Sequence, residues 1–188
     1  PQKGQAPLTR EYFEKAYYEE HRRTDRLFQR LSLPVGIGGA VCGAIGYFML
    51  NMPTARERWH LAVFCVPLVF LILTLLGVAY YVFSALIGYE YGYLPTSREI
   101  ADYAAELVGF YSDIPGIDVE RHVEEGIDSY MIERLIENNV RNARNNDARS
   151  AYLHNSYVWI VLSLSCLFLT VCSYVAMVTL CSNHRGTS

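Results

Sequence analysis

Residues 150–184, SAYLHNSYVWIVLSLSCLFLTVCSYVAMVTLCSNH, contain no Asp, Glu, Lys or Arg, and this stretch decides the fold. Two more stretches, residues 31–55 and 59–89, are equally free of charge. About 20 apolar residues in helical form cross the hydrocarbon core of a bilayer, and in lipid the backbone must satisfy its own hydrogen bonds. The sequence therefore predicts an all-α membrane protein with three transmembrane helices.

The charged residues lie in the remaining parts of the chain, and arginines flank the spans on one side. Because cytoplasmic flanks of membrane helices carry an excess of Arg and Lys, we expect the N-terminus and residues 90–149 to be cytoplasmic. The expected order is a cytoplasmic amphipathic helix (1–30), a transmembrane hairpin of two spans (31–89), a cytoplasmic helical region (90–149), a third transmembrane helix (150–182) and a tail (183–188).

Local signals mark the helix ends. Ser32 is predicted to cap the first span, and Thr96 with Glu99 forms a capping-box pattern. No Gly or Pro occurs between Ser129 and Leu180, so one helix is expected to run unbroken from the cytoplasmic region into the third span.

Composition and motifs argue against an enzyme. The net charge of −3 is unlike that of a general nucleic-acid coat protein. None of the five cysteines forms a CxxC pair, so neither a disulfide framework nor a zinc site is expected. There is no Gly-rich phosphate loop and no HExxH. Arg149 and His154 fit a loose ribonuclease pattern, of which about one match is expected by chance in a chain with this many Arg and His residues. We expect no catalytic residue, no metal and no cofactor.

Small residues line one face of the first span. Gly39 and Gly43 form a GxxxG pattern, which Gly36 and Ala40 repeat. Such a face allows close contact with another helix. The alternative is that glycine is simply common in membrane helices.

A small and partly polar stripe follows the third span, with spacings of three and four that place it on one helix face. It either packs against another helix or lines a water-filled path where several copies surround an axis. Its members are Ser163, Cys166, Thr170, Ser173 and Met177.

Residues 137–149, ENNVRNARNNDAR, combine asparagine and arginine just before the third span. Asparagine is a poor helix former, and Arg beside Asn suits phosphates and base edges. The alternatives are a satisfied polar layer between protomers and arginines anchored at lipid headgroups. The candidate ligand-binding residues are Arg134, Asn138, Arg141, Arg144, Asn145 and Arg149.

The layout, with the stretch ENNVRNARNNDARSAYLHNSYVWIVL at residues 137–162, resembles small bacterial membrane effectors of antiphage defence. These are the SLATT-type proteins and the membrane component of Hailong systems. The resemblance implies a homo-oligomer, a tetramer being one arrangement, in the bacterial inner membrane. It would depolarise or disrupt that membrane under control of a nucleotide or oligonucleotide from a nucleotidyltransferase partner. The usual two-span version of the family lacks the third span expected here.

Three functions remain open at this point, the third being a membrane-tied nuclease that uses Arg149 and His154. The first is a gated ion channel or pore without catalytic activity. The second is a non-conducting membrane anchor, or adaptor, that recruits a cytoplasmic partner.

Overall fold

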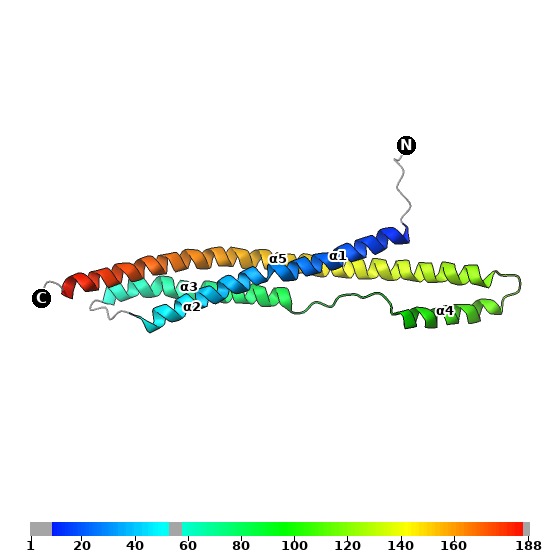
Figure 1. Ribbon diagram of the computed structural model, residues 1–188, viewed down its shortest axis with the longest axis horizontal. Helices are drawn as coiled ribbons and strands as arrows, with labels where there is room; N and C mark the ends of the chain where they lie inside the picture. Colours follow the sequence, from blue (N-terminus) through cyan, green and yellow to red (C-terminus); the bar gives the residue numbers. More distant parts are fainter. Residues whose placement is uncertain (1–8, 53–57, 186–188) are drawn as a thin grey trace, which may run out of the picture. The chain divides into compact units, whose positions relative to one another are not determined.

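The computed structural model describes residues 9–52 and 58–185, with side chains over 9–52 and 61–179, and these residues form helices and connections without a strand. The helices are α1 (Arg10–Arg30), α2 (Ser32–Leu50), α3 (Arg58–Leu86), α4 (Ser97–Ser112) and α5 (Val119–Arg185) (Figure 1). Within the described residues, three helical stretches are long and apolar enough to cross a membrane: Arg10–Leu50, Leu61–Leu86 and Val119–Thr179. The prediction of an all-α chain with three membrane-length helices is confirmed.

The chain divides into two compact units. Unit 1 consists of Pro1–Arg26 and Tyr89–Asp147, and unit 2 of Leu27–Gly88 and Ala148–Ser188. Unit 2 holds the charge-free stretches, and unit 1 holds most of the charged residues. Residues 53–57, where the turn between the first two spans is expected, and 186–188 of the expected tail lie outside the described residues.

The junction between α1 and α2 differs from the sequence prediction. The predicted cap at Ser32 is wrong: Leu31 holds the N-cap position without a side-chain bond, and Ser32 Oγ donates back to the Gln29 carbonyl at 2.8 Å. Leu31 N–H still bonds to the Phe28 carbonyl, and Val35 N–H to the Leu31 carbonyl. Because the two helices follow one another almost without a break, few N–H groups are left to cap.

Helix α4 begins with the predicted capping box, which is confirmed. Thr96 Oγ1 accepts from Glu99 N–H at 3.3 Å, while Thr96 N–H donates to the Glu99 carboxylate at 2.7 Å. The helix then packs on the start of α5, where the Tyr103 and Tyr130 rings stack with centroids 4.6 Å apart. The turn between α4 and α5 contains Gly116 at a φ of +82°, a conformation that glycine adopts without strain.

We expect the start of α4 to weaken at acid pH. The Thr96 N–H that bonds to Glu99 lowers the pKa of this carboxyl. The stabilising contribution is therefore present above the ordinary carboxyl pKa and lost as the pH falls through the lowered folded-state pKa. NMR titration of the Thr96 amide measures this, and Glu99→Gln should remove the titration while Glu106→Gln leaves it. A Glu99 pKa at or above its ordinary value would contradict the assignment.

Unit 2 is built from α2, α3 and the C-terminal part of α5, which lie side by side (Figure 1). One apolar cluster joins Val41 and Phe48 of α2 to Phe64 and Leu71 of α3 and Met177 of α5. A second cluster joins α1 and α3 to α5 and includes Leu27, Val82 and Leu153. At Gly77 the close approach of the Trp159 ring leaves no room for a β-carbon, since one there would lie 2.6 Å from Trp159 Cδ2.

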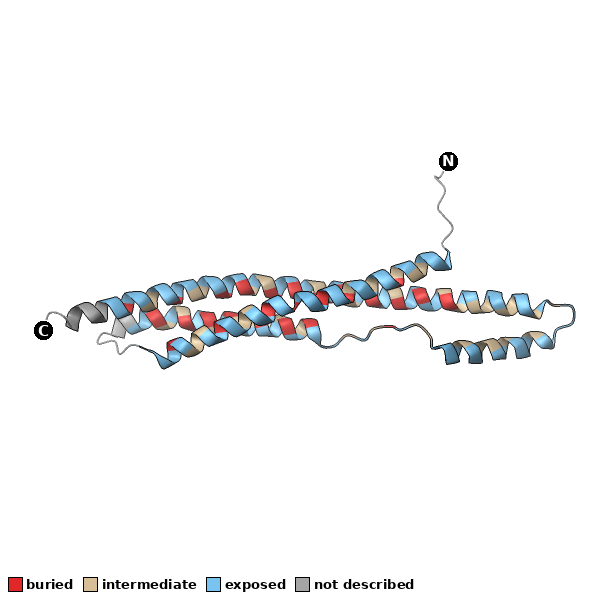
Figure 2. Ribbon diagram, in the orientation of Figure 1, coloured by how far each residue is buried: buried red, intermediate tan, exposed pale blue. Residues whose placement is uncertain are grey.

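Helix α5 is a single helix of 67 residues, which confirms the prediction of an unbroken helix. Its buried side chains follow a seven-residue repeat, visible as the buried side of α5 in Figure 2. A seven-residue repeat keeps one seam of a helix against its partners in left-handed packing. The positions at this spacing, each at most 3% exposed, are Leu135, Asn142, Arg149, Ser156, Ser163, Thr170 and Met177.

Candidate functional site

The most unusual polar feature of unit 1 is the segment between α3 and α4. Residues 89–96, which we call the linker, form neither helix nor strand. Buried backbone groups need hydrogen-bond partners, and here side chains of α5 supply them. These side chains form the asparagine row, defined as Asn138, Asn142, Asn145 and Asn146.

Each of the first three members of the row bonds to the linker backbone. Asn142 bonds to both polar groups of Gly92: its Oδ1 accepts from the Gly92 N–H at 2.8 Å, and its Nδ2 donates to the Gly92 carbonyl at 3.1 Å. Asn138 donates to the Tyr93 carbonyl at 2.8 Å, and Asn145 donates to the Glu90 carbonyl at 2.7 Å. A primary amide carries both donors and an acceptor, so the row satisfies the linker as a neighbouring strand would.

Position 92 accepts only glycine in this arrangement. A β-carbon there would lie 2.7 Å from Cγ and 3.0 Å from Cβ of Asn138, and it would overlap Asn138 Oδ1. The Tyr17 hydroxyl of α1 also donates to the Gly92 carbonyl, at 3.4 Å. Burial raises the pKa of this phenol, so it remains a donor at neutral pH. Gly92 is therefore the point at which α1, the linker and α5 meet.

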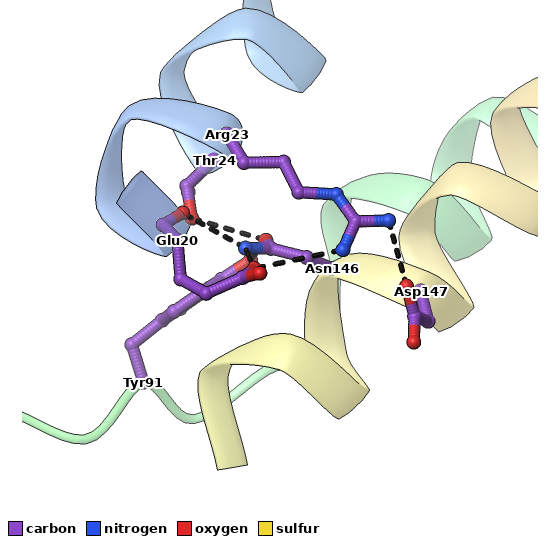
Figure 3. Close-up of polar contacts among 6 residues, drawn as sticks. All are labelled: Glu20, Arg23, Thr24, Tyr91, Asn146 and Asp147. Atoms are coloured by element: carbon purple, nitrogen blue, oxygen red, sulfur yellow. Dashed lines mark hydrogen bonds and ion pairs between the residues drawn. The ribbon is translucent and has the colours of Figure 1, made fainter. Parts of the chain in front are cut away.

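Asn146 is fully buried and joins α1 to the same place (Figure 3). Its Oδ1 accepts from the Thr24 and Tyr91 hydroxyls, each at 3.0 Å, and its Nδ2 donates to the Glu20 backbone carbonyl and carboxylate, each at 2.9 Å. Beside it, Arg23 pairs with Asp147 at 2.6 Å (Figure 3). The Asn146 side chain thus has a partner for each of its polar atoms and is not available to a ligand.

Arg149 lies in unit 2 and is 2% exposed. Its Nε donates to the Ala85 carbonyl at 2.8 Å, and its guanidinium lies 4.2 Å from the centre of the Phe28 ring. Ala85 stands in the last turn of α3, whose carbonyls lack partners within the helix. Arg149 thus caps the C-terminal end of α3, where a cation is also favoured by the helix dipole.

The six candidate ligand residues do not gather on one open surface. Asn138 and Arg149 are buried, and Asn145 is half-buried and bonded to the linker. Arg134, Arg141 and Arg144 are exposed, with Arg134 and Arg141 bonded to Glu137 at 2.9 and 3.3 Å. Only these three arginines face solvent.

The loose ribonuclease pattern has no matching geometry. Arg149 is buried while His154 is exposed, and a spacing of five residues separates them around the helix. Within the described residues, no three His, Cys, Asp or Glu side chains gather in a way that suits a metal ion.

The small residues of α2 point away from the other helices of unit 2. Gly36, Gly39, Ala40 and Gly43 are exposed, and a β-carbon added at any of these three glycines would meet nothing within 4 Å. The close contact expected for this face is therefore not made by the described residues of the same chain. Contact with a helix of another copy stays a prediction.

The polar stripe of the third span packs inside unit 2. Ser163, Thr170 and Met177 are buried, and Cys166 and Ser173 are half-buried. Thr170 donates to its own helix at the Cys166 carbonyl, at 2.8 Å, whereas the buried Ser163 hydroxyl has no partner among the described atoms. In this arrangement Met177 and Cys166 pack in the apolar cluster with α2 and α3, and Ser163 and Thr170 are buried.

No known family matches. A scan against protein-family models and searches of characterised proteins and solved structures all found nothing similar to this chain. The interpretation therefore depends on the geometry described above.

Sequence reasoning did not find Asn142, Asn146 or Gly92 as the centre of the site. Among the ligand candidates, Arg141, Asn145 and Arg149 are spaced four residues apart, and of these only Arg149 belongs to the buried face of α5. The seven-residue spacing of Leu135, Asn142 and Arg149 is the signal that identifies the buried face.

Proposed function

We propose that this chain is a membrane effector that makes a bilayer permeable to ions when several copies assemble. The proposed activity is physical and has no catalytic step. One observation carries the proposal: α5 is an uninterrupted helix that contains both the asparagine row and the third apolar span. Under the proposal, a change of contacts at the row acts on the helix that also forms the proposed membrane segment.

The exposed face of α2 supports assembly. It combines a GxxxG pattern with open space at Gly39 and Gly43, and small residues allow helices of neighbouring copies to approach closely in lipid. The buried position of Ser163 and Thr170 implies that one copy in this arrangement holds no open path. Under the proposal, conduction needs several copies and a rotation of α5.

Ion leakage from liposomes containing the full chain tests the proposal. The double variant Gly39→Ile and Gly43→Ile should lower leakage by about tenfold or more, because a loss of 1.4 kcal/mol in association already gives tenfold. Ala62→Ile, a change of similar bulk at an exposed position of α3, is the control and should leak like the parent. Crosslinking in the same liposomes reports the assembly. Undiminished leakage and assembly in the double variant would reject this face as the contact.

A regulatory anion would bind at Arg134, Arg141 and Arg144, which are the exposed members of the candidate set. The resemblance to antiphage effectors makes an oligonucleotide the first probe, so binding of a fluorescent ten-nucleotide oligoadenylate is the measurement. Three arginine–phosphate contacts give a slope of log K against log salt of about −2, and Arg141→Ala with Arg144→Ala should reduce it to about −0.7. Arg121→Ala, at an exposed arginine paired with Glu125, is the control. Equal slopes in both variants would remove the assignment.

A second candidate function is a non-conducting anchor that recruits a partner to unit 1. It is favoured by the burial of Ser163, Thr170 and Met177, which removes much of the predicted polar stripe from the surface of the third span. Intact assembly together with complete absence of leakage under all conditions would favour this alternative.

A further inference from the structure

The backbone of the linker is held by hydrogen bonds to side chains of α5. This backbone makes no helix or sheet, and the groups of Glu90, Gly92 and Tyr93 described above bond to asparagine side chains. A hydrogen bond of this kind contributes only about 1 kcal/mol net, because water replaces it when it breaks. Helix α5 keeps its own backbone bonds whether or not the linker is present. The linker can therefore detach while α5 remains folded.

The asparagine row is costly to α5 itself. Its four members and Asn139 stand in the helix between residues 138 and 146, and each is less favourable there than alanine by about 0.5 kcal/mol or more. Residues that oppose the local structure are expected where a site has a function. A connection needed only for rigidity is made at lower cost by apolar packing, as in unit 2.

We propose that the linker can detach from the asparagine row of α5 and bind to it again. When it is bound to the asparagine row, it holds the chain in the form described here. When it is released, the eight residues of the linker no longer bond to α5, and the permeable state begins. This inference rests on the proposed function for its second half, whereas release itself is independent of it. The position of Gly92 beside Asn138 and Asn142 carries the inference. The Gly92 N–H donates to Asn142, the Gly92 carbonyl accepts from Asn142, and Asn138 leaves no room for a side chain at residue 92.

A reversible crosslink tests the proposal. In a variant with Cys42, Cys65, Cys166, Cys172 and Cys181 replaced by alanine, we would introduce Gly92→Cys and Asn138→Cys. The two β-carbons lie about where a disulfide needs them, since a β-carbon at residue 92 is 3.0 Å from Asn138 Cβ and disulfides span roughly 3.5–4.5 Å after a small shift. The single variants, which cannot form the bond within one chain, are the controls.

The oxidised double variant should leak at least about tenfold more slowly than the reduced one, a difference of 1.4 kcal/mol, and reductant should restore leakage. Equal leakage from the crosslinked and the reduced protein would overturn the role of release in permeability. The single variants should not respond to reductant.

Hydrogen exchange of the parent protein separates this inference from the proposed function. The amide of Gly92, which bonds to Asn142 Oδ1, should exchange faster than the amide of Asn142 in α5 by about a hundredfold or more, because local opening costs less free energy than unfolding the helix. Exchange of the linker and α5 at one common rate would overturn release. Should no form of the protein leak, the proposed function fails, and the exchange rates still decide whether the linker detaches.

Discussion

Replacing Asn142 with leucine should free the linker and destabilise unit 1. The leucine removes both bonds of Asn142 to Gly92, which leaves the Gly92 N–H without a hydrogen bond and its carbonyl with only the 3.4 Å bond from the Tyr17 hydroxyl. A buried N–H without a partner costs about 1–3 kcal/mol and the lost bond to the carbonyl about 1 kcal/mol, so we expect a loss of about 3 kcal/mol. Thermal unfolding in detergent and hydrogen exchange at Gly92 measure the two effects, and exchange at Gly92 should accelerate by about a hundredfold for that free energy.

Asn139→Leu is the matched control, because the side chain is the same and the neighbouring helix position differs. The Asn139 Oδ1 is buried without a hydrogen-bond partner among the described atoms. Removing an unsatisfied buried oxygen is neutral or stabilising. Equal destabilisation by the two leucines would mean that helix context, and not the linker, determines the effect at Asn142.

Replacing Arg149 with methionine should destabilise unit 2 by about 3 kcal/mol. The change leaves the Ala85 carbonyl without its charged donor, which costs about 1.5–3 kcal/mol. It also removes the contact with the Phe28 ring, worth about 0.5–2 kcal/mol. Methionine fills much of the vacated volume, so the loss reports the polar contacts more than a cavity. The measurement is thermal unfolding in detergent, followed by circular dichroism.

Two further variants test whether the loss comes from the contacts of the Arg149 guanidinium. Arg149→Lys should recover less than half of the loss, because an ammonium group does not bond to Ala85 and stack on Phe28 as the planar guanidinium does. Arg121→Met, at an arginine whose side chain is 71% exposed, should change stability by less than about 0.5 kcal/mol. A parent-like Arg149→Met protein would show that α3 does not need this cap.

Much of the fold is predictable from the sequence because lipid and helix geometry leave few choices. The absence of charge in residues 31–55, 59–89 and 150–184 identifies the three membrane-length helices, and the absence of Gly and Pro after Ser129 predicts the continuous α5. The capping box at Thr96 is a local pattern and needs no tertiary contact. Ser32 misleads because its local signal is overridden by the continuation of α1 into α2.

The site is less predictable than the fold because the linker, which is one of its two parts, has no periodic sequence pattern. The linker, YEYGYLPT, has neither a helical nor a strand pattern, so nothing in it identifies asparagines about fifty residues later as its partners. The row itself was recognised as unusual, with a satisfied polar layer among the alternatives. That layer forms within one chain, around Gly92, while the expected anion would be left with the exposed Arg141 and its neighbours.

The middle of the seven-residue seam of α5 is nearly identical from one repeat to the next, with Ser156, Ser163 and Thr170 in turn. Sliding the helix by seven residues, about 10 Å, would exchange one small hydroxyl for another at each contact. The contacts that differ along α5 are those of Arg149 with Ala85, of the Trp159 ring with Gly77, and of Met177 in the apolar cluster. The register of this helix in unit 2 is therefore encoded by these three contacts and not by the repeated small hydroxyls of the seam.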